Sequence, residues 1–273
     1  MLHPRWDERV RRDVARPHVI RVAAAAGTPA RVAIISDFHG NLLALEAVVA
    51  DLSTVRPDAV VVGGDIAQGA PAPDRVVDLV GRHGWPAIIG NADAFLLDIH
   101  DGIGSSSAPS ALLNSARWAA EHLTPAHLDF LRDLPAALRI EAPGGPPLTL
   151  VHATPWSIDD IVLRDAPDEV AARMLEMAGT PVVGYGHIHS PYQRRVRDGL
   201  LFSVGAVSGS NDRDPRPAYT VVTLAAGVTL EVRRVPFDAT AAVKAVRASG
   251  APVTENLLRA MTTGGPWDVA PAE

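Results

Sequence analysis

The sequence predicts an α/β fold that begins with parallel strands and continues with antiparallel hairpins. Short apolar runs, each followed by a loop and then by a stretch with helical periodicity, recur from residue 31 onward. Strands that alternate with helices in this way indicate a parallel sheet. After residue 190, short turn signals separate the strand-like runs, which favours antiparallel pairing. At 273 residues, the chain has the length of one α/β domain with a large core.

The first strand and helix units are the clearest. Residues 32–35 form a continuous apolar run, which suits a strand buried on both faces, and residues 42–52 show the apolar period of a helix. A strand at 59–62 and a helix at 75–80 repeat this arrangement, and a third strand is expected at 87–89. The alternation predicts that these strands lie side by side in one sheet.

The alternation stops between residues 94 and 137. A cluster of glycine and serine at 102–107 leads into two stretches with helical character, 111–121 and 125–134. Thr124 followed by a proline is typical of an N-cap and a first helical position. We interpret 94–137 as a helical insertion at the mouth of the functional site.

The remaining segments complete the predicted domain at 30–263. Residues 1–29 show no sustained apolar period and are expected to be an extension outside the fold, and 264–273 are expected to be an unstructured tail. Further strands are expected at 138–141, 148–151, 181–184, 194–197, 200–204, 219–224 and 228–235, and further helices at 167–178, 239–249 and 254–261.

The composition excludes several classes of protein. The net charge of -6 and the pI near 5.9 give no general attraction for nucleic acid or anionic lipid. The absence of cysteine excludes disulfides, thiolate metal ligands and a cysteine nucleophile. No apolar stretch approaches the roughly 20 residues that span a bilayer, and none suits a signal-peptide core. We expect a cytoplasmic protein that acts on a small molecule, without extended nucleic acid or membrane as a partner; homo-oligomerisation stays open.

Metal-binding side chains follow the predicted strands in five short segments. They comprise two Asp, four His and one Asn, and this mixture of hard oxygen and imidazole nitrogen suits a pair of divalent transition metals. In open α/β sheets, ligands bind beyond the carboxyl ends of the strands, which is where these segments lie. The segments are Asp37-Phe38-His39, Gly64-Asp65, Gly90-Asn91, His152 and Gly186-His187-Ile188-His189.

Most of these segments, taken singly, also have a structural explanation. Asp37 could cap the helix that follows it, and His152 could be a hydrogen-bonded core histidine. Asp65 and Asn91 could be ordinary turn residues. The segment His187-Ile188-His189 points most directly to function, because two imidazoles on one face of an extended segment have little structural use.

The order and spacing of the five segments together resemble the calcineurin-like metallophosphoesterase superfamily, whose pattern runs D-x-H, G-D, G-N-x-[DE], H and G-H-x-H. The resemblance covers roughly residues 31–235, and segments 36–41 and 214–219 are similar to the small bacterial and archaeal phosphodiesterase branch. This resemblance implies a four-layered α/β/β/α sandwich, in which two mixed sheets are flanked by helices, with the helical insertion near the active site.

The resemblance also implies a role for each ligand. A hydroxide that bridges two ions would be the nucleophile, and Asp65, Asn91 and His152 would take part in catalysis. The two ions could be Mn, Fe, Zn or Ni, which ligand type does not distinguish. The first ion would be held by Asp37, His39, Asp65 and His189, and the second by Asp65, Asn91, His152 and His187.

Two departures from the family pattern bear on substrate choice. Many relatives have His where this chain has Ala92, so a proton donor for the leaving group is missing and good leaving groups should be favoured. Asp93 is then expected to be an N-cap for a helix at Ala94. His100 is a hypothetical replacement for the missing acid, and the amide of Asn91 is expected to point at a phosphoryl oxygen.

The second departure is the loop Ser203-Val204-Gly205-Ala206-Val207, where relatives often show Asn-Pro-Gly-Ser-Val. Nearby, Arg213 and Arg216 could clamp a phosphoryl group, or could be exposed loop arginines. The leading expectation is a metal-dependent phosphodiesterase that acts on small diesters. A phosphomonoesterase, including a protein phosphatase or a dinucleoside tetraphosphate hydrolase, is the alternative. A non-catalytic scaffold of the same fold ranks last, because all seven ligands are present.

Overall fold

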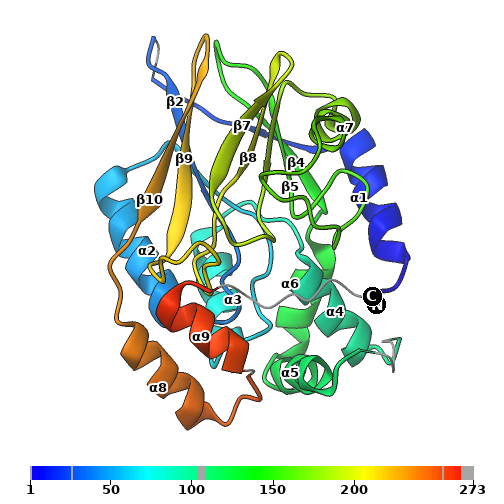
Figure 1. Ribbon diagram of the computed structural model, residues 1–273, viewed down its shortest axis with the longest axis vertical. Helices are drawn as coiled ribbons and strands as arrows, with labels where there is room; N and C mark the ends of the chain where they lie inside the picture. The colour runs from blue at the N-terminus through cyan, green and yellow to red at the C-terminus, as the bar shows by residue number, and fades with distance from the viewer. Residues whose placement is uncertain (1, 26, 104–107, 254, 266–273) are drawn as a thin grey trace.

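Two β-sheets pack face to face, and helices cover both outer faces of the pair (Figure 1). The computed structural model describes every residue except 1, 26, 104–107, 254 and 266–273. Most of the tail expected at 264–273, and part of the Gly/Ser cluster, therefore lie outside the described residues. The expectation of a four-layered α/β/β/α sandwich with two mixed sheets is confirmed.

The smaller sheet carries the first strand that the sequence predicts. Its central strand, β2, has its side chains buried on both faces: Val32 and Ile34 point into the core between the sheets, and Ala33 and Ile35 pack toward helices. β2 runs parallel to β3 and antiparallel to β9. The order in the sheet is β10 (Val228–Arg234), β9 (Ala218–Leu224), β2 (Ala30–Ile35) and β3 (Ala59–Val62).

The larger sheet has six strands and is also mixed. β5 runs parallel to β6, and β6 runs parallel to β8, whereas β7 and β8 form the expected hairpin. The order is β1 (His18–Arg21), β4 (Ala137–Glu141), β5 (Leu148–Val151), β6 (Val182–Tyr185), β8 (Gly199–Ser203) and β7 (Tyr192–Val196).

The core between the two sheets is apolar. Ile34 and Val222 from the smaller sheet meet Leu150 and Phe202 from the larger sheet, and each of these side chains is fully buried. Burial of such side chains stabilises the fold by about 1.5–3 kcal/mol each. The packed sheets give a rigid base for the loops at the strand ends.

Helices complete the outer layers. α2 (Leu42–Val55) and α3 (Pro73–His83) cover the smaller sheet, and α7 (Asp168–Ala178) covers the larger one. α2 begins where the Asn41 side chain accepts a hydrogen bond from the Ala44 N–H. Beyond the sheets, α8 (Ala239–Ser249) and α9 (Glu255–Thr263) pack on each other. None of the helices in the described part of the chain is long and apolar enough to cross a membrane.

The expectation that residues 1–29 lie outside the fold is wrong. Residues Arg5–Ala15 form α1, which buries Trp6 and Val10, and β1 pairs in parallel with β4 at the sheet edge. The buried stripe of α1 contains only two large apolar residues, spaced by one helical turn, together with Asp13, so the sequence shows no sustained apolar period. The N-terminal segment is therefore part of the outer layer on the larger sheet.

The helical insertion forms, but it begins earlier than expected. α4 (Asn91–His100) starts at the predicted ligand Asn91, and α5 (Ser110–Glu121) and α6 (Pro125–Asp133) follow. Thr124 caps α6 as predicted, by accepting a hydrogen bond from the His127 N–H. The third strand expected at 87–89 is reduced to a single parallel bridge between Val62 and Ala87.

Candidate metal centre

The seven predicted ligands converge at the carboxyl ends of four strands. The loop after β2 supplies two of them, the turn after β3 supplies one, and the segments after β5 and β6 supply three more. The last comes from the first turn of α4. Because β2 and β3 are parallel neighbours, as are β5 and β6, their ends bring these side chains to one place.

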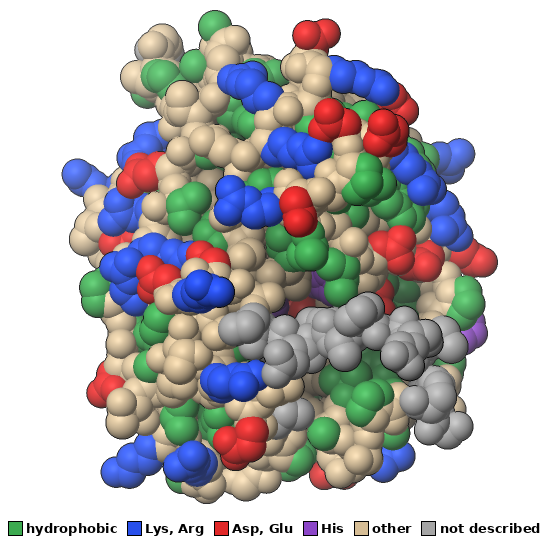
Figure 2. All heavy atoms as spheres, in the orientation of Figure 1, with side chains coloured by type: hydrophobic (Ala, Val, Ile, Leu, Met, Phe, Trp, Pro, Cys, Tyr) green, Lys and Arg blue, Asp and Glu red, His purple; other side chains and the backbone are tan. Residues whose placement is uncertain are grey.

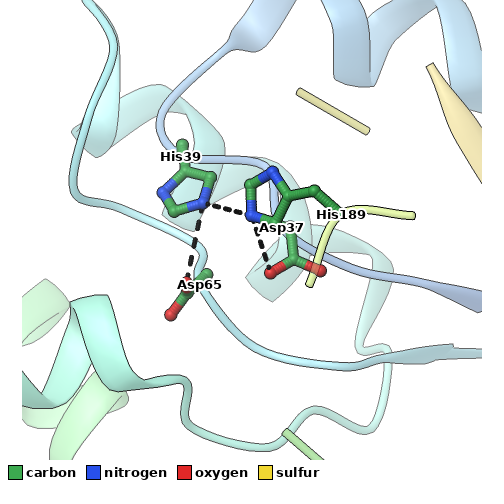
Figure 3. A group of neighbouring side chains, drawn as sticks. All are labelled: Asp37, His39, Asp65 and His189. Carbon is green, nitrogen blue, oxygen red and sulfur yellow. Dashed lines mark hydrogen bonds and ion pairs between the residues drawn. The ribbon is translucent and has the colours of Figure 1, made fainter. Parts of the chain in front are cut away.

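Four of the side chains form a compact group, drawn in Figure 3. Their ligand atoms all lie within 4.8 Å of one another. His189 Nε2 lies 3.3 Å from Asp37 Oδ1 and 3.1 Å from His39 Nε2, and His39 Nε2 lies 3.6 Å from Asp65 Oδ2. This set, Asp37, His39, Asp65 and His189, is the set predicted for the first ion; we call it the inner group.

The other three side chains adjoin the inner group through Asp65. His152 Nε2 lies 3.4 Å from Asp65 Oδ2 and 2.8 Å from Asn91 Oδ1. His187 Nδ1 lies 3.0 Å from the same Asn91 oxygen. We call Asn91, His152 and His187 the outer group, because two of its three side chains are only partly buried, against one of four in the inner group. On the face shown in Figure 2, histidine and carboxylate side chains are visible in a recess near the middle.

Every imidazole in the site is oriented by a backbone carbonyl. In each ring, one nitrogen faces the cluster and the other donates to a carbonyl oxygen, which fixes the tautomer and leaves the inward nitrogen as a ligand. The donating atoms are His39 Nδ1 to Gln68 (2.9 Å), His152 Nδ1 to Gly63 (2.8 Å), His187 Nε2 to Asp159 (3.1 Å) and His189 Nδ1 to Gly209 (2.7 Å).

The backbone is strained at the ligand positions. Of the eight non-glycine residues with positive φ in the described part of the chain, five are predicted ligands. Such conformations cost of order 1–3 kcal/mol each and persist where the surroundings enforce them, typically at functional sites. The five are Asp37, His39, Asp65, His187 and His189, with φ of 60°, 49°, 53°, 65° and 55°.

Two glycines allow the segments to approach this closely. A Cβ at Gly90 would overlap the Asp65 side chain, and a Cβ at Gly186 would overlap Ser36 and Asp37. The glycines in the G-N and G-H motifs therefore remove side-chain bulk where two strand ends meet. Their neighbours Asn91 and His187 reach the cluster as a result.

The carboxylates are held in their charged form. Burial alone would raise the pKa of Asp37, but the His189 imidazole beside it lowers that pKa below its ordinary value. The pKa of Asp65 is also lowered, because His152 and His39 outweigh the cost of burial. Both groups are thus anionic at neutral pH and suited to a cation.

Each group contains one imidazole that favours a proton and one that does not. Burial opposes the charge of His152, yet the Asp65 carboxylate raises the pKa of His152 to about 10. Burial and the neighbouring His152 lower the pKa of His187 to about 4. In the inner group, Asp37 raises the pKa of His189 and burial lowers that of His39. In each group, a carboxylate thus favours a proton on the neighbouring imidazole, at a place where a cation could stand.

The residues present fit a divalent metal. Asp37 Oδ2 is buried and has no hydrogen-bond partner among the described residues. His39 Nε2 and His189 Nε2 face each other at 3.1 Å although both Nδ1 atoms are occupied by carbonyls, so their facing lone pairs require a proton or a cation between them. Oxygen and imidazole donors in this number suit Mn, Fe, Zn or Ni.

Asp93 differs from its expected role. It does not cap a helix at Ala94, because α4 begins at Asn91 and Asp93 lies inside its first turn. Its buried carboxylate accepts backbone N–H groups of Ile66, Ala67 and Gly90. Burial and the charge of Asp65 raise the pKa of Asp93 to about 7. Asp93 thus fixes the turn that carries Asp65.

The structure does not bring His100 to the cluster. His100 is the last residue of α4, about 14 Å along the axis from Asn91 at 1.5 Å per residue. Of the two alternatives for Arg216, the structure favours the exposed loop arginine, because its side chain is exposed and its guanidinium holds the Asp214 carboxylate through Nε and Nη2. The side chain of Arg213 is exposed, and a contact with substrate stays a prediction for it.

Sequence reasoning missed Asp159. Its carboxylate accepts a hydrogen bond from Asn91 Nδ2 at 2.9 Å, and its backbone carbonyl accepts one from His187 Nε2. The signal was present, since Asp159 and Asp160 lie in the loop that follows β5 and His152. The strand-end argument that selected His152 extends to that loop.

The fold and the ligand cluster together identify the class of protein, and comparison with known proteins agrees. A metal-ligand cluster at the strand ends of a four-layered sandwich defines a metallophosphoesterase architecture. Residues 31–227 match the calcineurin-like phosphoesterase superfamily domain, and the chain belongs to this superfamily. The resemblance inferred from the motifs is thereby confirmed, and the chemistry of the family is hydrolysis of phosphoesters.

Three individual proteins are similar to this chain in sequence or in fold. A metallophosphoesterase from Sphaerobacter thermophilus is 28% identical, with a TM-score of 0.69, over 87% of this chain and 100% of that one. A hypothetical protein from Pyrococcus horikoshii OT3 shares the fold, with a TM-score of 0.76 at 18% identity over 86% and 99% of the two chains. An uncharacterised protein of Methanocaldococcus jannaschii is 26% identical over 67% of this chain and 72% of its own length.

Proposed function

We propose that this protein hydrolyses phosphodiester bonds of small substrates with two divalent metal ions. The observation that carries the proposal is the position of the Asp65 carboxylate. Its Oδ2 lies 3.6 Å from His39 Nε2 and 3.4 Å from His152 Nε2, so one oxygen faces both groups. A shared carboxylate of this kind is suited to hold two ions a few ångströms apart.

Residues of the protein would hold the metal ligands in their binding orientation before substrate binds. When bound, the ions lower the pKa of coordinated water toward about 7 and neutralise phosphoryl oxygens. Backbone carbonyls hold each imidazole with its inward nitrogen free, and Asp93 holds the turn of Asp65. The ligands would be divided as Asp37, His39, Asp65 and His189 for one ion, and Asp65, Asn91, His152 and His187 for the other.

The absence of a proton donor at position 92 supports a preference for esters with good leaving groups. Ala92 stands where many relatives have His, and a methyl group cannot protonate a leaving oxygen. Esters whose leaving group is stable as an anion need no such proton. We rank phosphomonoesterase, protein phosphatase and dinucleoside tetraphosphate hydrolase activities below phosphodiesterase activity, because segments 36–41 and 214–219 are similar to the small phosphodiesterase branch.

A substrate screen on the wild type and Asp65→Asn tests the proposal. Each protein is loaded with Mn, Fe, Zn or Ni and assayed on bis-p-nitrophenyl phosphate and p-nitrophenyl phosphate. We expect the wild type to hydrolyse the diester faster than the monoester, and Asp65→Asn to lose both activities. Equal rates in the two proteins would refute the mechanism, and a wild type that favours the monoester would refute the diester assignment.

A further inference from the structure

Asp159 links the exposed rim of the site to two predicted ligands. Its Oδ1 accepts a hydrogen bond from Asn91 Nδ2 at 2.9 Å, and its carbonyl oxygen accepts one from His187 Nε2 at 3.1 Å. The residue itself is exposed. A single residue thus contacts both partly buried members of the outer group from the solvent side.

The side-chain contact decides which way the Asn91 amide faces. An amide has one acceptor oxygen and one donor nitrogen, and only the oxygen can bind a cation. Because Asn91 Nδ2 is directed to the Asp159 carboxylate, Asn91 Oδ1 faces His152 Nε2 and His187 Nδ1. The carbonyl of Asp159 likewise keeps the Nδ1 of His187 turned inward.

The loop that carries Asp159 is fixed on both sides. The Asp159 N–H donates to Ser157 Oγ at 3.2 Å, and the Ser157 N–H donates to the buried Thr154 Oγ1 at 2.9 Å. The neighbouring Ile158 N–H donates to Asp7 Oδ1 of α1 at 2.9 Å. The carboxylate is therefore held at the mouth by the fold and does not depend on a bound ligand for its position.

The charge of this carboxylate has a consequence for substrate choice. Asp159 occupies the amide donor that we expected to meet a phosphoryl oxygen, so a phosphoester that reaches Asn91 lies beside a fixed negative charge. A phosphomonoester carries about 1.5 to 2 negative charges at pH 7, because its second pKa is near 6. A phosphodiester lacks that second ionisation and carries about one. Repulsion by Asp159 is therefore stronger for the monoester.

We propose that Asp159 is a specificity-determining residue, which orients Asn91 by its hydrogen bond and disfavours dianionic phosphomonoesters by its charge. This inference rests on the proposed phosphoesterase function and adds the physical cause of a preference for singly charged diesters. Discrimination by a repulsive group complements the missing proton donor at Ala92, because the two act on different steps: binding and departure of the leaving group.

The test separates the charge of Asp159 from its hydrogen bond. Asp159→Asn keeps an acceptor for Asn91 Nδ2 and removes the charge, whereas Asp159→Ala removes both. Asp160→Asn is the matched control, since Asp160 is an adjacent exposed carboxylate that accepts from Trp156 Nε1 instead. Wild type and variants, loaded with Mn²⁺, are assayed at pH 8 on p-nitrophenyl phosphate and bis-p-nitrophenyl phosphate, and their metal content is measured.

In Asp159→Asn we expect the ratio of kcat/KM for the monoester to kcat/KM for the diester to rise about tenfold. A factor of this size corresponds to the repulsion between two unit charges a few ångströms apart in a partly aqueous medium. The gain should come from a lower monoester KM, and Asp160→Asn should keep the wild-type ratio. Asp159→Ala should bind less than the wild-type amount of metal, because the Asn91 amide is no longer oriented.

Three results would overturn the inference. One is an unchanged ratio in Asp159→Asn with diester activity intact, and another is the same shift in Asp160→Asn. The third is full metal content in Asp159→Ala, which would remove the positioning role. A wild type that hydrolyses neither ester with any of the four metals is a different outcome, since it refutes the proposed function from which the inference starts.

Discussion

The two halves of the site differ in how far the fold encloses them. In the inner group, three of the four side chains are buried and His39 is half-buried, whereas in the outer group only His152 is buried and Asn91 and His187 are half-buried. The inner group combines two carboxylates with two imidazoles, and the outer group contributes a neutral amide in place of a carboxylate. The difference indicates a rigid half that holds its ion and an open half that can admit substrate.

The surroundings explain this contrast. The inner group is covered by the loop after β8, where the Ser208 N–H donates to the Asp37 carbonyl and the Asn211 N–H donates to the His189 carbonyl. The outer group is bordered by the exposed Asp159. Backbone hydrogen bonds thus hold the covering loop over the inner group, and the exposed Asp159 contacts the outer group at its solvent side.

The largest expected effect comes from the residue that joins the halves. Asp65→Asn removes the charge that both groups share, so we expect hydrolysis to fall by about 10³-fold, the upper range for loss of one preorganised electrostatic group. Metal content should fall for both ions together, as measured by elemental analysis. Loss of only one ion would show that Asp65 is a ligand in one group only and does not join the two groups.

Chelator titration tests the contrast in enclosure directly. We expect metal to leave in two steps, with the outer ion lost at lower chelator concentration.

Two variants assign the steps to the two groups. His187→Ala should abolish the first step and leave the second, because it removes a ligand from the outer group only. His39→Ala should do the reverse. We expect each variant to lower the affinity for the ion of its own group by at least about 10–100-fold, since mutation of even an indirect partner of a metal ligand lowers metal affinity by that factor. A single step in the wild type would contradict the distinction.

Metal binding to the outer group should depend on pH through His152. The pKa of His152 in the metal-free protein is raised to about 10 from 6.5, so its pairing with Asp65 stabilises the fold fully below pH 6.5 and is lost as the pH rises through 10. Metal must displace this proton, so affinity should increase with pH by up to about tenfold per unit between these limits. Calorimetry at pH 8 in two buffers of different ionisation enthalpy should detect release of about one proton or more; none would contradict the assignment of His152.

The smallest expected effect comes from the contact between α1 and the loop that carries Asp159. Asp7→Ala removes the hydrogen bond from the Ile158 N–H at 2.9 Å, and we expect a loss of about 1 kcal/mol in the free energy of unfolding. The outer ion should then leave at lower chelator concentration, with the inner ion unaffected. Glu8→Ala is the matched control, since Glu8 is exposed on the same helix. An equal change in both variants would show that α1 supports the fold without acting on the site.

The sequence predicted most of the central strands because they are continuous apolar runs with glycine or polar residues at their ends. β2, β3, β5 and β6 are short, buried on at least one face, and followed at once by the ligand motifs. The same local logic predicted the Thr124 cap. These features depend on neighbouring residues only, so they are visible without a structure.

What the sequence did not reveal depends on partners distant in the chain. The buried face of α1 exists because Trp6 Nε1 meets Asp98, ninety-two residues away, and β1 is a strand because β4 lies beside it. The 87–89 segment has strand composition but bridges its neighbour only once. Asp159 gains its position through a loop anchored to α1. No periodicity or spacing encodes such contacts.

The positive φ angles at five ligand positions limit how this protein can change over evolutionary time. Left-handed backbone geometry admits Asn, Asp, His and Gly far more readily than β-branched or bulky residues. In a gene copy freed from selection for hydrolysis, substitutions to residues that tolerate left-handed geometry should therefore accumulate at these turns. Substitutions to β-branched or bulky residues would harm folding as well as chemistry. In a deep mutational scan, tolerance at Asp37, Asp65 and His187 should follow backbone preference even when abundance, and not turnover, is selected.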